Sequence, residues 1–236
     1  MRRHVRINIV KVEFGGGILM KINVYGESKL PKILILHPME ITGAELYHIF
    51  SPYLEAKYCI VAPDQGAHGD SGAYLSQEAE FGMLTDYLTE HHLTDFQAIY
   101  AASMGCTLGV ELIGDKRFSF NHIWFDGACF SENASFMNFI MRSMFLRKAK
   151  QMRKNPTLPP SNLLQMYGPE LGELMKKNFV RFSDDDIKRI CYSCTHYYLR
   201  QVPTEIQKKC ILSGESMIPT KRCLRKGWHS FIRKQR

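Results

Sequence analysis

The chain has 236 residues, of which 45% are hydrophobic and 23% charged, so it can bury a sizeable core and is neither disordered nor fibrous. Its formal net charge of +8 is concentrated at the ends, since residues 1–11 carry four Lys or Arg, residues 221–236 carry seven, and neither segment contains an acid. Without these eleven, 20 basic residues face 23 acidic ones. This distribution favours solvated tails over a nucleic-acid or anionic-membrane contact, and no specific nucleic-acid partner is expected.

The sequence predicts neither a secretory signal nor a membrane span. The first 20 residues begin with basic residues, but polar residues and three glycines interrupt their apolar part. No run approaches the ~18 uninterrupted apolar residues of a spanning helix. The seven cysteines are scattered, which favours a reducing cytoplasm. Cys191 and Cys194 have redox or zinc spacing, but without a second pair we interpret them as ordinary apolar residues.

The first 19 residues do not fit the alternation of strand and helix patterns in the rest of the chain. An opening strand and turn fit the run MKINVYGE from Met20, after a break of three glycines. We hypothesise that residues 1–19 are a non-native or disordered extension. Sequencing the N-terminus of the protein from its source tests this, because a start at Met1 would exclude a mis-assigned beginning.

From Met20 onward, short apolar runs alternate with helical patterns. The runs end in polar or Gly-rich turns and predict buried strands of a parallel sheet, at residues 32–38, 58–64, 96–103, 120–128 and 208–215. Helical spacing occurs between them at residues 44–56, 78–92 and 105–116. This alternation predicts a doubly wound, mostly parallel α/β fold, with residues 20–128 as its core.

The alternation stops at residues 129–205 and resumes in residues 206–236, which hold the end of the core and a basic tail. The interrupted stretch predicts a long Met- and Phe-rich amphipathic helix at 131–155, one or two helices at 161–179, and a last one at 183–202. We interpret it as a helical cap that acts as a lid, with its Met-rich face lining an apolar substrate pocket. The alternative is that this face is packed core.

Two details of the cap can be read from its residues. Ser183 and Asp186 have the spacing of a capping box at the start of the last helix, with Asp where Glu or Gln is usual. The basic residues of the first helix are expected on its solvated side, and an anionic partner for them stays open. They are Arg142, Arg147, Lys148, Lys150, Arg153 and Lys154.

The stretch from Ala98 to Leu112 predicts a strand, a tight turn centred on Ser103, and a helix that begins near Met104. The pattern Ala101-x-Ser103-x-Gly105 is a one-residue variant of the G-x-S-x-G nucleophile elbow, in which small residues let the strand and the helix approach closely. A serine hydroxyl reacts only when a base takes its proton and preset N–H groups receive the oxyanion.

The oxyanion donors can be predicted locally. The helix after Ser103 directs its N-terminal N–H groups at a reacting carbonyl, so the N–H of Met104 is one candidate donor. The second should come from a loop after an earlier strand. His37-Pro38-Met39 supplies such a loop, with the N–H of Met39 as the candidate.

These motifs together resemble the α/β-hydrolase superfamily of serine hydrolases with a helical cap. His37-Pro38-Met39 is similar to its His-Gly-x oxyanion loop, residues 64–71 (DQGAHGDS) to its D-x-R-G-H-G-x-S loop, and residues 125–128 (FDGA) to the strand before its cap. The motifs occur in order from about Met20 to Glu215. The resemblance implies an esterase, lipase or peptidase that uses Ser, Asp or Glu, and His without a cofactor, with the cap inserted after the sixth family strand.

The chain departs from this family at the acid. In the family the acid follows the strand after the cap, in a Gly-x-x-Asp turn, but here Met217 holds that place. The nearest carboxylates are Glu215, in the same turn, and Asp126, at the end of the preceding strand, where some members have their acid. Both stay open as candidates, and Asp126 is otherwise a turn or capping residue.

The chain departs from the family at the base as well. Members end with a further strand and a loop that carries the histidine, and here that C-terminal strand is expected to be missing, as a truncated end would explain. His229 is the only histidine beyond the last predicted strand, so it is the candidate base, with a surface histidine in a basic tail as the alternative. The remaining histidines considered are expected in structural or surface positions: His37, His68, His91, His92 and His196.

These residues support two functions from different classes. The first is a cytoplasmic serine hydrolase that cleaves a small ester or related acyl substrate through Ser103, with no metal and no cofactor. The second is a non-catalytic α/β-hydrolase-like protein that holds an apolar ligand, or a truncated, inactive form of a hydrolase. The second is motivated by the lack of an acid and a histidine at the positions typical of the family. The sequence does not predict the oligomeric state.

Overall fold

The computed structural model describes residues 7–14, 17–54, 57–127, 133–155, 169–196 and 202–213. Its centre is a seven-stranded sheet of order β1-β2-β4-β3-β5-β6-β7. The five strands predicted from the apolar runs are present and mutually parallel. They are β3 (Lys32–Leu36), β4 (Cys59–Asp64), β5 (Asp95–Ala102), β6 (Ser119–Asp126) and β7 (Cys210–Ser213).

A hairpin at the start of the chain completes the sheet. Strand β1 (Ile7–Phe14) pairs antiparallel with β2 (Gly17–Tyr25), and β2 pairs antiparallel with β4. Residues 7–14 are therefore an edge strand of the same sheet, whereas the sequence analysis assigned no strand before Met20. The reason is that β2 already offers a free edge, and strand pairing across a short turn is decided by backbone hydrogen bonds as well as by side-chain pattern. Whether residues 1–19 are native stays a prediction.

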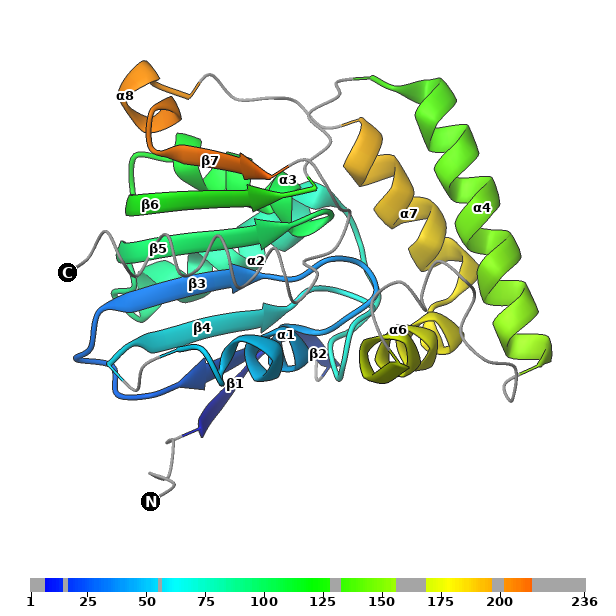
Figure 1. Cartoon of the computed structure of the whole chain (residues 1–236), viewed down its shortest axis with the longest axis horizontal. Coiled ribbons are helices and arrows are strands. Elements are labelled where there is room, and N and C mark those ends of the chain that lie inside the picture. The colour runs from blue at the N-terminus through cyan, green and yellow to red at the C-terminus, as the bar shows by residue number, and fades with distance from the viewer. Residues whose placement is uncertain are drawn as a thin grey trace.

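Helices cover both faces of the sheet, as the doubly wound prediction requires (Figure 1). Helix α1 (Gly43–Phe50) lies on one face, and α2 (Gln77–Glu90) and α3 (Gly105–Gly114) lie on the other. Each face has its own buried apolar cluster, because successive residues of a strand point to opposite sides. In β5, Ala98 and Tyr100 belong to the α1 cluster, whereas Ile99 and Ala101 belong to the α2 and α3 cluster.

Between β6 and β7 the chain forms α4 (Ser135–Lys154), α6 (Pro169–Arg181) and α7 (Asp184–Thr195), which we call the cap helices, followed by the short α8 (Thr204–Gln207). The cap helices stand beyond the carboxyl ends of the parallel strands, with α4 outermost (Figure 1). The predicted capping box is confirmed at the start of α7, where the Ser183 and Asp186 side chains each accept the other residue's backbone N–H.

Helix α4 carries Met and Phe residues on two different sides. Its inner side is packed core, since Phe145, Ala149 and Met152 are buried and Met144 packs against the same cluster. Its outer side is not, since Phe136 and Phe139 are exposed. The inner side therefore belongs to packed core, whereas no described element covers the outer apolar residues of the first two turns.

Candidate active site

Ser103 occupies the turn between β5 and α3, as predicted. Its φ of +46° lies in the left-handed region that residues other than glycine rarely adopt. The Ser103 N–H donates to the main-chain oxygen of Asp126 at 2.9 Å, and the Ser103 carbonyl accepts from the Cys106 N–H at 2.9 Å. The side chain is partly exposed, and none of the described residues hydrogen-bonds its hydroxyl. The turn thus presents a serine hydroxyl at the carboxyl edge of the sheet.

Small residues around Ser103 are required by close packing. A Cβ on Gly105 would lie 2.6 Å from the carbonyl oxygen of Leu36, so the first turn of α3 rests directly on the end of β3. A Cβ on Gly109 would lie 2.6 Å from the ring of Phe125 and 3.1 Å from the Cβ of Ala101. These contacts explain why small residues occur here, because a larger side chain at Ala101, Gly105 or Gly109 would push the strand and the helix apart.

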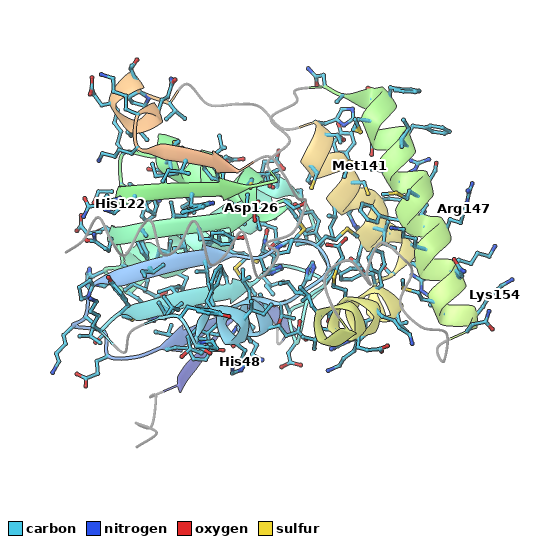
Figure 2. All side chains as sticks on the ribbon, viewed as in Figure 1. His48, His122, Asp126, Met141, Arg147 and Lys154 are labelled. Carbon is cyan, nitrogen blue, oxygen red and sulfur yellow. The ribbon has the colours of Figure 1, made fainter. Side chains whose placement is uncertain are left out.

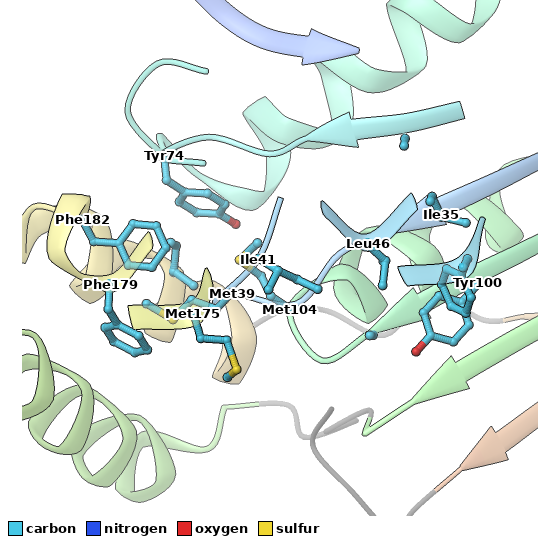
Figure 3. Packing of buried hydrophobic residues seen from close by; sticks show 14 of the residues in the cluster. Ile35, Met39, Ile41, Leu46, Tyr74, Tyr100, Met104, Met175, Phe179 and Phe182 are labelled. Carbon is cyan, nitrogen blue, oxygen red and sulfur yellow. The ribbon is translucent and has the colours of Figure 1, made fainter. Parts of the chain in front are cut away.

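The loop after β3 lies against the same turn. Met39 and Met104 are buried in one apolar cluster, and their side chains lie near each other in Figure 3. No hydrogen bond among the described residues uses the N–H of Met39 or of Met104. Both N–H groups have the position in the chain that an oxyanion donor needs, one after β3 and one at the start of α3.

His37 and His68 hold this loop in place. The Nε2 of His37 accepts the Gln65 N–H at 2.9 Å, which fixes the Nδ1 of that ring as the donor to the Pro38 carbonyl at 2.8 Å. The two ring nitrogens of His68 face the carbonyls of Gly66 and Met39, and a neutral ring donates to one of the two at a time. Burial lowers the pKa of both histidines, that of His37 well below its ordinary value. They act as scaffold, as expected from the sequence, and neither faces the Ser103 hydroxyl with a free nitrogen.

Asp126 ends β6 directly beside the turn, in register with Ala102. Its main-chain oxygen holds the Ser103 N–H, and its side chain is buried, with Oδ2 accepting the Tyr100 hydroxyl at 3.1 Å. Figure 2 shows Asp126 at the carboxyl end of its strand. The structure therefore brings this candidate acid next to the candidate nucleophile, while the hydrogen bond from Tyr100 also gives the carboxylate a structural role.

Two histidines expected in structural or surface positions make hydrogen bonds of their own. His196 bonds the hydroxyls of Ser135 and Thr195 and stacks on Tyr192 with ring centroids 4.4 Å apart. His91 caps α2, with its Nδ1 3.0 Å from the Tyr87 carbonyl. Within the described residues no histidine hydrogen-bonds the Ser103 hydroxyl.

Known proteins resemble the chain in structure. No family model matches the sequence, and no curated protein matches it. Among solved structures, an esterase from Exiguobacterium antarcticum aligns with a TM-score of 0.63 and 13% identity, over 91% of this chain and 96% of its own. A bromoperoxidase from Bacillus anthracis aligns with a TM-score of 0.64 and 13% identity, over 88% and 80%. An alpha/beta hydrolase enzyme from a Medee basin deep-sea metagenome library aligns with a TM-score of 0.60 and 12% identity, over 88% and 82%.

The chain has the α/β-hydrolase fold. The resemblance inferred from the motifs is confirmed at the level of fold, including the mostly parallel sheet and the helices inserted between β6 and β7. Two of the predicted site residues, Glu215 and His229, lie outside the described residues. The part of the chain where the family has its C-terminal strand also lies outside them, so the predicted lack of that strand stays a prediction.

Glu40 is a residue of the site region that the sequence reasoning missed. It directly follows Met39, and burial raises the pKa of its carboxyl to about 7, against the opposing attraction of Lys148 on α4. Its carbonyl accepts the side-chain amide of Asn178 on α6 at 3.0 Å. Its position directly after Met39 could be read from the sequence, but its burial depends on the cap helices, which are far away in sequence.

The described residues contain no group of three or more His, Cys, Asp or Glu side chains placed to hold a metal ion. Cys191 and Cys194 lie within α7 and are not disulfide-bonded, and burial raises the pKa of Cys191 to about 12, which opposes thiolate chemistry. Across the described part of the chain, every helix is too short or too polar to cross a bilayer. The cytoplasmic location stays a prediction.

Proposed function

We propose that the chain is a serine hydrolase that cleaves a small ester or related acyl substrate through Ser103. The observation that carries this proposal is the conformation of Ser103, a non-glycine residue at φ +46° between a strand and a helix, whose hydroxyl is not hydrogen-bonded by the described residues. Strained backbone of this kind persists where surrounding structure enforces it, and functional sites are where it concentrates. The similarity to the esterase from Exiguobacterium antarcticum supports the same reaction class.

In the proposed reaction the Ser103 oxygen attacks the substrate carbonyl, and the N–H groups of Met39 and Met104 receive the oxyanion. A histidine takes the hydroxyl proton and returns it to the leaving group, and water then releases the acyl group. His229 is the proposed base, and Asp126 or Glu215 is the proposed acid that orients this histidine. The place of Asp126, one strand away from Ser103 at the same edge of the sheet, supports it as a candidate acid.

An apolar acyl group fits the surroundings proposed for the substrate. Met39, Ile41 and Met104 pack in one cluster with Met175 and Phe179 of α6 (Figure 3). Methionine side chains adapt to irregular apolar shapes at little cost, so a cap that uses them suits a small apolar ligand. We therefore propose that the cap helices act as a lid for a small-molecule substrate, and that the reaction needs no cofactor.

Labelling with a fluorophosphonate probe tests this proposal. The wild-type chain should react with the probe at neutral pH, and Ser103→Ala should abolish labelling. Ser135→Ala is the matched control, because Ser135 is another serine at the start of a helix and has a histidine nitrogen 3.1 Å from its hydroxyl. It should label like the wild type; loss of labelling in this variant instead of Ser103→Ala would contradict the assignment.

The second candidate function is a non-catalytic ligand-binding protein or an inactive form of a hydrolase. The observation that favours it is that no described histidine bonds the Ser103 hydroxyl. It predicts no labelling at any pH and no effect of His229→Gln. If the chain does label, comparing Asp126→Asn with Glu215→Gln identifies the acid, because removal of a triad member costs several orders of magnitude in rate.

A further inference from the structure

The first two turns of α4 carry large apolar side chains on the outside of the molecule. Phe136 is 78% exposed, Phe139 63%, and Met137 and Ile140 43% each. Isolated exposed apolar residues are ordinary, but four within five positions of one helix form a contiguous patch, and such patches mark contact surfaces. No described element of the chain covers them, and α4 is the outermost of the cap helices (Figure 1).

The second half of the same helix is cationic on the same face. Arg147, Lys150 and Lys154 are exposed, and among the described residues no acid forms an ion pair with them. Figure 2 shows Arg147 and Lys154 pointing away from the rest of the molecule. Their spacing from Phe136 and Ile140, in steps of three, four and seven, puts all five residues on one stripe of the helix.

The other two basic residues of this half, Lys148 and Arg153, interact with acidic groups of the protein itself. Arg153 pairs with Asp184 of α7 at 2.6 Å, and the charge of Lys148 is felt by the buried carboxyl of Glu40. The helix contains no acidic residue at all. Its outer stripe is thus apolar for the first two turns and cationic for the last two, over a helix about 30 Å long.

We propose that this stripe of α4 docks the protein on an anionic lipid surface. Phe136, Phe139 and Ile140 enter the boundary between headgroups and acyl chains, and Arg147, Lys150 and Lys154 lie against lipid phosphates. A bilayer with anionic lipids offers an apolar layer and a negative surface side by side, which is the combination that binds interfacial helices.

A nucleic acid fits the same stripe less well. Its phosphates would complement Arg147 and Lys154, and the rings of Phe136 and Phe139 could stack on unpaired bases. The aliphatic Ile140 and Met137 would stay exposed to water, however, whereas a bilayer buries all four side chains. The docking helix also contacts the candidate active site, since Phe145 and Met152 on the inner side of α4 belong to the same buried cluster as Met39 and Met104. The docking proposal does not depend on hydrolysis, because binding is measured without a substrate.

Vesicle co-sedimentation of the full chain tests the proposal. Vesicles of phosphatidylcholine with phosphatidylglycerol should bind the wild type, and Phe136→Ser/Phe139→Ser/Ile140→Ser should bind about ten-fold more weakly, since it removes most of the inserted apolar area. Arg147→Gln/Lys150→Gln/Lys154→Gln should lose the preference for the anionic lipid. Tyr53→Ser is the matched control, because this 37% exposed aromatic follows α1 at the amino edge of the sheet, away from α4.

A tryptophan probe separates insertion from attraction by the basic ends of the chain. With the same vesicles, Phe139→Trp should shift its emission to the blue and be quenched by brominated acyl chains, whereas Tyr53→Trp should not. The proposal would be overturned if the triple serine variant bound vesicles as well as the wild type does. It would also be overturned if vesicle binding were lost only when the basic residues at the chain ends are neutralised. So would failure to bind vesicles combined with salt-sensitive binding of an RNA or DNA duplex. Circular dichroism confirms that each variant is folded.

Discussion

Ser103 adopts a left-handed backbone conformation because the chain must pass from β5, which ends at Ala102, into α3, which begins at Gly105, within two residues. That conformation costs a non-glycine residue about 1–2 kcal/mol. Two main-chain hydrogen bonds, to Asp126 and from Cys106, and the contact of Gly105 with Leu36 hold it there. The consequence is a serine side chain lifted out of the sheet, which is what a nucleophile at the carboxyl edge requires.

Gly105 offers a sharp test of this packing. A Cβ at this residue would meet the carbonyl oxygen of Leu36 at 2.6 Å, and since that oxygen belongs to a central strand, it cannot move cheaply. We expect Gly105→Ala to lower the free energy of unfolding by about 1–3 kcal/mol, measured by urea denaturation. It should also reduce probe labelling of Ser103, because the helix and the turn move together.

The matched control is Gly82→Ala in α2. Nothing lies within 4 Å of a Cβ built at Gly82, so this change should raise the free energy of unfolding by about 0.5–1 kcal/mol through loss of backbone freedom in the unfolded chain. If the two alanine variants had the same stability, the close approach of α3 to β3 would be wrong.

At the scale of elements, the cap is attached to the core by polar contacts at its helix ends. Asp186 of α7 serves two elements at once: its Oδ2 completes the capping box with Ser183, and its Oδ1 accepts the N–H of Tyr74 at 3.0 Å. Asn178 of α6 similarly donates to the carboxylate of Glu45 on α1 at 2.9 Å. These bonds attach α7 to the segment around Tyr74 and α6 to α1.

We expect Asp186→Ala to lower the free energy of unfolding by about 2 kcal/mol, because it removes one half of the capping box and leaves the buried N–H of Tyr74 without this acceptor. Thermal denaturation measures the effect. Asp185→Ala is the control on the same turn; it deletes an exposed carboxylate paired with Lys188 and should leave the melting temperature unchanged. Equal melting of the two variants would contradict the role given to Asp186.

At the scale of the whole molecule, three buried carboxyls on different loops and helices link stability to pH. Burial raises the pKa of Asp64 to about 6, that of Glu40 to about 7 and that of Glu80 to about 8. Where the folded chain keeps a proton that the unfolded chain has released, stability falls as pH rises. The lowered pKa values of His37 and His68 act oppositely, but only below their ordinary value of 6.5.

Between pH 7 and 8 Glu80 is therefore the largest contributor, with a smaller one from Glu40, and the Glu80 carboxylate accepts the Gly66 N–H at 2.9 Å. The wild type should lose roughly 1 kcal/mol of stability across this unit of pH, and Glu80→Gln should lose clearly less. Urea denaturation at several pH values measures both. Glu78→Gln, which removes an exposed carboxylate from the same helix, should follow the wild type, and an identical pH slope for Glu80→Gln would refute the linkage.

Much of this architecture could be predicted from local patterns. The apolar runs that end at Leu36, Ala102 and Asp126 are strands because their residues are continuous, β-favouring and followed by turn residues. The capping box at Ser183 was equally local. Strand β1 could not be predicted in this way, since its place depends on pairing with β2, and the burial of Glu80 could not, since Gly66 and Tyr74 approach it only after folding.

By itself, then, the sequence determined the alternation of strands and helices, the serine turn, the loop of Met39 and the helical insertion, because each is encoded in residues close together along the chain. Only the tertiary structure decided that Asp126 touches the Ser103 backbone, which partners His37 and His68 bond, and that the apolar residues in the first turns of α4 face outward. Those facts rest on contacts between distant segments, whose free energy depends on burial and hydrogen bonding rather than on spacing in the sequence.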